Sequence, residues 1–179
     1  MNLALCLWLF WTYSFLGYLL EKGYAAVTAS PRQARKCFFL LPLCPVYGLG
    51  ALAVLALPPE LTEGFWSLAL WGALTATAVE YAVHLLYDRL LGVQFWDYSR
   101  VRWNIRGRVC LPFTLAWGLL TATALPPLQA LLVPALSAAP PGLTYVLLLV
   151  TTADGVISAA LLRRTGDPEC LRLWTPKAA

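Results

Sequence analysis

Charged residues are scarce in this chain. Asp, Glu, Lys and Arg make up 12% of its 179 residues, whereas 60% of the residues are hydrophobic. Soluble globular domains carry roughly 25% charged residues, so the composition excludes an ordinary soluble domain. It predicts instead a protein that is embedded in lipid.

Metal ligands and common catalytic motifs are also scarce. His84 is the one histidine, and the five cysteines lack the spacing of a metal site: Cys6, Cys37, Cys44, Cys110 and Cys170. We expect no metal and no cofactor, and we expect the cysteines to pack as small apolar side chains. The chain contains no GxxxxGK(S/T), GxSxG or HExxH motif, which argues against ATP binding by a P-loop and against two hydrolase mechanisms. Enzymatic activity stays open, and a non-enzymatic role is favoured.

Long apolar stretches are abundant. A helix needs about 20 mainly apolar residues to cross a bilayer. Five stretches qualify, at 3–20, 38–57, 65–86, 109–125 and 143–162. The first is not expected to be a cleaved signal, because it lacks a basic start and Glu21 and Lys22 follow it. The pattern predicts an all-α, polytopic membrane helix bundle with about five transmembrane helices.

Prolines interrupt two of these stretches. Pro126-Pro127 kinks or ends the fourth, so 128–136 either continues that helix or forms a short interfacial one. The second begins with Pro42 and Pro45, each of which lacks a backbone donor. A broken helix at membrane depth is tolerated only where protein or a water-filled cavity satisfies the freed backbone groups.

Basic residues follow a simple distribution. All 13 Lys and Arg residues fall in 22–36, 89–108 and 163–177, and the other two connections contain none. The positive-inside rule therefore places the N-terminus outside and the C-terminus in the cytoplasm. We expect residues 1–164 to form a single transmembrane domain of a multi-pass plasma-membrane protein. Residues 165–179 are expected to form a short cytoplasmic tail.

The stretch QFWDYSRVRWNIRGRVCLPF at 94–113 mixes arginines with large aromatic residues. Its position between two apolar stretches favours the cytoplasmic membrane interface, where aromatic rings anchor and arginines attract anionic lipid headgroups. Membrane lipids are therefore expected partners. Nucleic acid is not expected, since a membrane-tethered loop of this length hardly supplies a free basic face.

Ionisable residues inside apolar stretches are costly and suggest function. Glu80 and His84 lie one turn apart in the third stretch, and Asp154 interrupts the fifth. Structural alternatives stay open: Glu80 pairs with Arg108 or Arg89, His84 is a satisfied interfacial residue, and Asp154 bonds hydroxyls of a neighbouring helix. We expect seven side chains to converge on one cytoplasm-facing, substrate-binding pocket: Glu21, Cys44, Tyr47, Glu80, Asp97, Asn104 and Arg108.

Four segments resemble one family in order and spacing over roughly residues 10–120: YSFLGYLLE, PLCPVYGLG, EY, and FWDYSRVRWNIRGRVCLPFTLAWG. They are similar to small bacterial membrane proteins labelled ABC-transporter permeases, the CmpB-like family. The resemblance implies a polar cytoplasmic motif at matching positions: Glu21, Cys44, Pro45, Tyr47, Gly48, Glu80, Trp96, Asp97, Tyr98, Asn104, Gly107 and Arg108. Leu41, His84, Asp88 and Phe95 depart from the family pattern, which leaves substrate preference open.

The resemblance favours a specific role for the 94–113 stretch. We predict that Asp97 and Arg108 form a charge-assisted pair that closes the loop over the pocket near Glu80. Asp97 and Asn104 are also common turn residues, so local backbone bonds are the alternative.

Three functions are compatible with these features. The first is a transport component that relies on a separate ATPase subunit, with at least two copies assembling because five helices enclose little space. The second is an intramembrane enzyme acting on a lipid headgroup or small amphiphile, with Arg108 and Asn104 binding an anionic group and Glu80 or Asp97 moving protons. The third is a structural or regulatory membrane subunit without catalysis.

Overall fold

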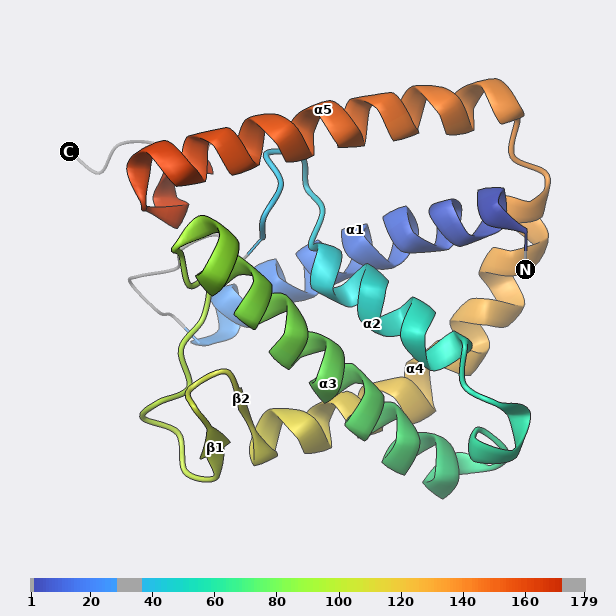
Figure 1. Ribbon diagram of the computed structural model, residues 1–179. Helices are drawn as coiled ribbons and strands as arrows, with labels where there is room; N and C mark the ends of the chain where they lie inside the picture. The colour runs from blue at the N-terminus through green and yellow to red at the C-terminus, as the bar shows by residue number, and fades with distance from the viewer. Residues whose placement is uncertain (1, 29–36, 172–179) are drawn as a thin grey trace.

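The computed structural model describes residues 2–28 and 37–171 of the chain and confirms the all-α prediction (Figure 1). Four helices are long and apolar enough to cross a membrane: α1 (Leu3–Thr28), α3 (Phe65–Leu91), α4 (Leu111–Ser137) and α5 (Pro141–Thr165). Helix α2 (Pro45–Leu55) is shorter. The remaining elements are η1 (Pro59–Leu61), η2 (Pro168–Leu171) and the two-residue strands β1 (Asn104–Ile105) and β2 (Val109–Cys110), which pair antiparallel. Arg32, Arg35, Lys36, Arg172 and Lys177, which contribute to the charge distribution, lie outside the described residues.

The second apolar stretch is only half helical. Residues 37–44 form a non-helical segment that reaches from α1 toward the middle of α5 and returns to α2, which Pro45 starts (Figure 1). The Asp154 carboxylate accepts hydrogen bonds from the backbone amides of Leu40, at 3.0 Å, and Leu41, at 2.9 Å. Protein atoms thus satisfy backbone groups of the broken start that the two prolines predicted.

A disulfide closes the same segment. Cys37 and Cys44 are bonded to each other, and both are buried, at 2% and 1% exposure. The expectation that all cysteines are unpaired packing residues is therefore wrong for these two, because the non-helical segment brings its ends together. Cys6, Cys110 and Cys170 are free thiols.

Helix α4 continues through Pro126 and Pro127 and bends along its course, so the 128–136 stretch extends the fourth helix (Figure 1). Its two halves have different neighbours. The first half packs closely on α3, where a side chain at Gly118 would meet the Ala69 carbonyl oxygen at 2.6 Å. The second half packs on α1, where Gln129 donates a hydrogen bond to the Tyr13 hydroxyl at 2.9 Å.

The remaining packing joins α1 to its neighbours. Gly48 of α2 lies against α1, and an added Cβ there would meet the Phe10 carbonyl oxygen at 2.6 Å. Helix α5 lies along one side, where it contacts the 37–44 segment as well as α1 and α3 (Figure 1). The Trp8 indole of α1 donates to the Thr144 hydroxyl of α5 at 2.9 Å.

Candidate functional site: a carboxylate and aromatic cavity

Glu80 lies on the middle of α3 and is only 4% exposed. Its Oε1 accepts a hydrogen bond from the Tyr98 hydroxyl at 3.0 Å, and its Oε2 accepts one from the Trp117 indole at 2.9 Å. Tyr98 comes from the connection after α3, and Trp117 comes from α4. Burial, followed by the nearby Glu80 carboxylate, raises the pKa of the Tyr98 hydroxyl, which therefore stays protonated and acts as the donor.

Glu21 lies on α1 and makes a similar contact. The Tyr47 hydroxyl of α2 donates to Glu21 Oε1 at 2.8 Å. The Tyr47 ring meets the Trp117 ring edge-on, with 5.1 Å between their centroids. Gly17 permits this arrangement, since a Cβ there would collide with the Tyr47 side chain. One continuous set of contacts therefore joins the two carboxylates through Tyr47 and Trp117.

These residues line two neighbouring cavities. The larger has a volume of about 400 Å³ and the smaller about 250 Å³, and both have Tyr47, Glu80 and Trp117 in their walls. The wall of the larger cavity also includes Leu20 of α1 and Leu119 of α4, which are 45% and 59% exposed. The cavity therefore opens sideways between α1 and α4, on a surface that faces lipid if these helices span the membrane.

The connection after α3 is organised by local bonds. Asp97 accepts hydrogen bonds from the backbone amide and the hydroxyl of Ser99, both at 2.8 Å, and these bonds lower the Asp97 pKa. The Asn104 amide donates to the Val101 carbonyl at 2.8 Å, and its oxygen accepts from the Gly107 amide at 2.9 Å. Gly107 has φ of 70°, which favours glycine. Both polar side chains thus shape the turn, as the local-backbone alternative predicted.

Arg108 does not pair with Asp97, so the predicted pair is wrong. Its guanidinium bonds the Asp88 carboxylate at the end of α3, at 2.8 Å, and lies 5.4 Å from the Tyr81 ring centroid. The bond to Asp88 raises the Arg108 pKa. Asp97 is already engaged by Ser99, whereas Asp88 lies within reach on the last turn of α3.

Three of the seven expected site residues come together at the cavities: Glu21, Tyr47 and Glu80. Cys44 is in the disulfide, and the walls described for the two cavities do not include Cys44, Asp97, Asn104 or Arg108. Trp117 was missed as a site residue, although it lies in the quoted AWG segment. Tyr98 was implied by the resemblance alone.

The two other intramembrane ionisable residues have structural partners. The His84 Nε2 lies 3.0 Å from the Trp96 carbonyl oxygen, whereas the buried Nδ1 has no hydrogen-bond partner among the described residues, so the expectation of a satisfied residue holds for one ring nitrogen only. Asp154 receives a hydroxyl bond from Ser158 of its own helix at 3.0 Å, in addition to the two backbone amides. The expected hydroxyl partner on a neighbouring helix is therefore replaced by backbone donors of the 37–44 segment.

Comparison with known proteins identifies the family. The model of the family described as "Putative ABC-transporter type IV" (CmpB) matches residues 8–159. The chain belongs to this family. No curated protein and no solved structure matches it. The family and the four membrane-compatible helices make it an ABC-transporter-type membrane protein, which confirms the resemblance seen in the sequence.

The matched region contains every residue that joins the two carboxylates, from Glu21 through Tyr47 and Glu80 to Trp117. Membership of an ABC-transporter family also makes association with other subunits, such as an ATPase, a reasonable expectation.

Proposed function

We propose that this chain is the membrane component of a transporter and that its ligand occupies the cavity between α1, α2, α3 and α4. The observation that carries the proposal is the pair of carboxylates, Glu21 and Glu80, in the wall of a cavity between apolar helices. Ionisable side chains in a membrane are costly and usually mark ligand or ion pathways. The family of the chain supports the same function.

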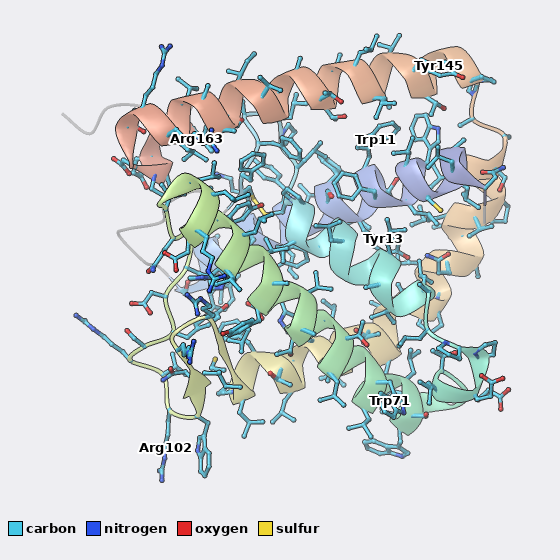
Figure 2. All side chains as sticks on the ribbon, in the orientation of Figure 1. Trp11, Tyr13, Trp71, Arg102, Tyr145 and Arg163 are labelled. Carbon is cyan, nitrogen blue, oxygen red and sulfur yellow. A yellow bond between two sulfur atoms is a disulfide. The ribbon has the colours of Figure 1, made fainter. Side chains whose placement is uncertain are left out.

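The energy source in this proposal is a separate subunit. Residues 1–179 contain no P-loop, and we propose that ATP is hydrolysed by a separate subunit. The exposed arginines offer a docking surface, since Arg102 and Arg163 lie toward one end of the molecule and Tyr145 lies toward the other (Figure 2). We propose that this basic end faces the cytoplasm and contacts the ATPase, and that at least two copies of the chain assemble.

The orientation is testable by cysteine labelling in intact cells. A variant lacking the free thiols Cys6, Cys110 and Cys170 provides the background. A membrane-impermeant maleimide added from outside should modify a cysteine at Glu63, in the connection before α3, and should not modify one at Ser99. Modification at Ser99 from outside would contradict the cytoplasmic placement of the basic end.

Transport itself is testable in everted membrane vesicles of the producing cells, which retain any partner ATPase. Thr123 lies in the cavity wall, so its replacement by cysteine reports on access to the cavity. Adding Mg-ATP should change the rate at which N-ethylmaleimide alkylates this cysteine. A non-hydrolysable ATP analogue should not produce the same change in the alkylation rate.

Ser137 provides the matched control for Thr123. The hydroxyl of each residue donates to the backbone carbonyl four residues earlier, but Ser137 lies at the other end of α4 and outside the cavity walls. A cysteine at Ser137 should react at a rate that ATP does not alter. An unchanged rate at Thr123 under all nucleotide conditions would contradict ATP-driven transport by this chain.

A further inference from the structure

We infer that the smaller cavity holds one hydrocarbon chain of a membrane amphiphile, whose polar end lies in the larger cavity. This inference names the ligand class of the site proposed above. It rests on the proposed function only in taking the two cavities as a ligand site.

The wall of the smaller cavity is largely aliphatic. The cavity has a volume of about 250 Å³, and apolar side chains from α1, α2 and α4 form most of its wall, among them Leu16, Ala51, Val54, Leu125 and Leu128. Apolar cavities stay dry and bind apolar molecules. An empty cavity also forfeits dispersion contacts, which a hydrocarbon chain would restore. The composition of this wall therefore favours hydrocarbon.

The polar side chains of the same wall are bonded within the protein. They form these pairs: Tyr13 with Gln129, Tyr47 with Glu21, Thr121 with the Trp117 carbonyl, and Glu80 with the Trp117 indole. A polar group of a ligand would have to displace one of these bonds, whereas a hydrocarbon chain leaves all of them in place.

Gly50 of α2 shows that protein side chains leave this space unfilled. The residue is buried and lies in the wall of the smaller cavity, yet a Cβ built on it would have nothing within 4 Å. Protein interiors are close-packed, so open space in front of a buried glycine is unusual. The unfilled volume therefore lies inside the protein, where a ligand chain can complete the packing.

The smaller cavity opens where it adjoins the larger one. Its exposed wall residues are Leu20 of α1 and Leu120 of α4, at 45% and 38% exposure, and both also line the larger cavity. These helices are long and apolar enough to span a membrane. A chain that enters from lipid between α1 and α4 can therefore reach both cavities.

The two cavities follow each other along α1. The larger one extends to Tyr24, whereas the smaller one extends from Leu20 back to Tyr13, a helical rise of about 10 Å. The larger cavity also takes Trp96 and Tyr98 from the basic connection after α3 into its wall. Tyrosine and tryptophan are typical of the membrane interface. This order, interfacial side chains first and aliphatic ones deeper, matches an amphiphile of the leaflet next to the basic end.

Photo-crosslinking of the full-length protein in nanodiscs of phosphatidylethanolamine and phosphatidylglycerol tests the ligand class. Two probes carry a diazirine at the end of a hydrocarbon chain, one a phospholipid and the other a long-chain alcohol, and each is a minor component of the bilayer. Mass spectrometry locates the label. We expect label on Val54, which lies in the smaller wall and is 2% exposed, as well as on the exposed Leu149 of α5.

The two probes distinguish the sources of the chain. Label on Val54 from the phospholipid would assign a bilayer lipid, and label from the alcohol alone would assign a single-chain amphiphile. Label on Leu149 without label on Val54, from both probes, would overturn the inference.

Variants that fill the smaller cavity place the chain there. Gly50→Leu and, from α4, Ala124→Leu should each reduce the label on Val54 at least tenfold relative to that on Leu149. Gly142→Leu is the matched control and should be labelled as wild type. A Cβ at this helical glycine also has nothing within 4 Å, but Gly142 lies at the start of α5, outside both walls.

One variant suffices for the decision. If Gly50→Leu does not yield monodisperse protein, Ala124→Leu is measured alone. Undiminished label on Val54 in Ala124→Leu would contradict a chain in the smaller cavity.

The two proposals fail separately. Absent label on Val54, together with an ATP-dependent change at a cysteine replacing Thr123, would reject the ligand class and retain transport. Label on Val54 that the filling variants abolish, without any ATP effect, would retain the chain site and reject ATP-driven transport.

Discussion

Asp154 and Glu80 are both acidic residues within apolar helices, and both are buried, at 7% and 4% exposure. Their donors differ. Asp154 receives two backbone amides and the Ser158 hydroxyl, whereas Glu80 receives a phenol and an indole from side chains that line a cavity. Backbone donors cannot turn away, but side-chain donors can rotate when a ligand arrives. The comparison indicates that Asp154 is a structural support, whereas the side-chain contacts of Glu80 can be rearranged more easily.

Replacing Asp154 by alanine should have the largest effect on stability. The change removes the two part-buried hydrogen bonds from the Leu40 and Leu41 amides, and each such bond to a charged group contributes about 1–3 kcal/mol. We expect the free energy of unfolding to fall by about 2–6 kcal/mol, measured by SDS titration of the protein in micelles. Asp154→Asn keeps one acceptor and should lose roughly half as much. If Asp154→Ala is as stable as the wild-type protein, Asp154 is not a structural support.

Two glycines of α2, Gly48 and Gly50, allow the effect of a purely structural contact on stability to be measured. A Cβ at Gly48 would meet α1, whereas one at Gly50 has nothing within 4 Å. Gly48→Ala should destabilise the protein by about 1–3 kcal/mol through overpacking. Gly50→Ala should leave stability unchanged or raise it by about 0.5–1 kcal/mol, because alanine favours a helix. The measurement is the apparent melting temperature of each purified variant. Equal melting temperatures would contradict the close packing of Gly48 on α1.

Replacing Glu80 by glutamine should change stability little. The amide keeps the shape and one acceptor, so it loses one of the bonds to Tyr98 and Trp117 while relieving a buried charge. We expect a loss of about 1 kcal/mol in the free energy of unfolding, measured by SDS titration in micelles. If Glu80→Gln instead destabilised the protein as much as Asp154→Ala does, Glu80 would be a structural support in the same way as Asp154.

The Arg108–Asp88 pair should matter least. The two side chains are 14% and 32% exposed, and partly exposed ion pairs contribute little. Asp88→Asn should lower the free energy of unfolding by less than any of the destabilising changes above, because solvent screens the pair. A loss above that of Gly48→Ala would show that this pair, and not the α1–α2 contact, supports the cavity region.

The helices follow from the apolar runs of the sequence, which reach bilayer length and carry few charges. The broken start of the second stretch was also predictable, because Pro42 and Pro45 cannot donate. Its partner was not, since Asp154 lies 114 positions from Leu40 and nothing local identifies such a contact.

The site was predicted in part for similar reasons. Glu21, Tyr47 and Glu80 follow from their cost or placement in apolar stretches and from the resemblance. The Asp97–Arg108 pair failed because a neighbouring hydroxyl and amide on Ser99 compete at short range. Trp117 carried no signal of its own, since an indole in an apolar helix is usually packing.

The bend in α4 has a mechanical consequence. Residues 111–125 pack on α3, while the half beyond Pro127 packs on α1, so the prolines join the part of α4 that is fixed to α3 to the part that is fixed to α1. The first half is about 22 Å long. A rotation of about 5° at the prolines would therefore displace its far end, near Phe113, by about 2 Å. That end contacts Tyr24 of α1, with 6.3 Å between the ring centroids of Tyr24 and Phe113, so the angle of the bend sets the distance between these two rings.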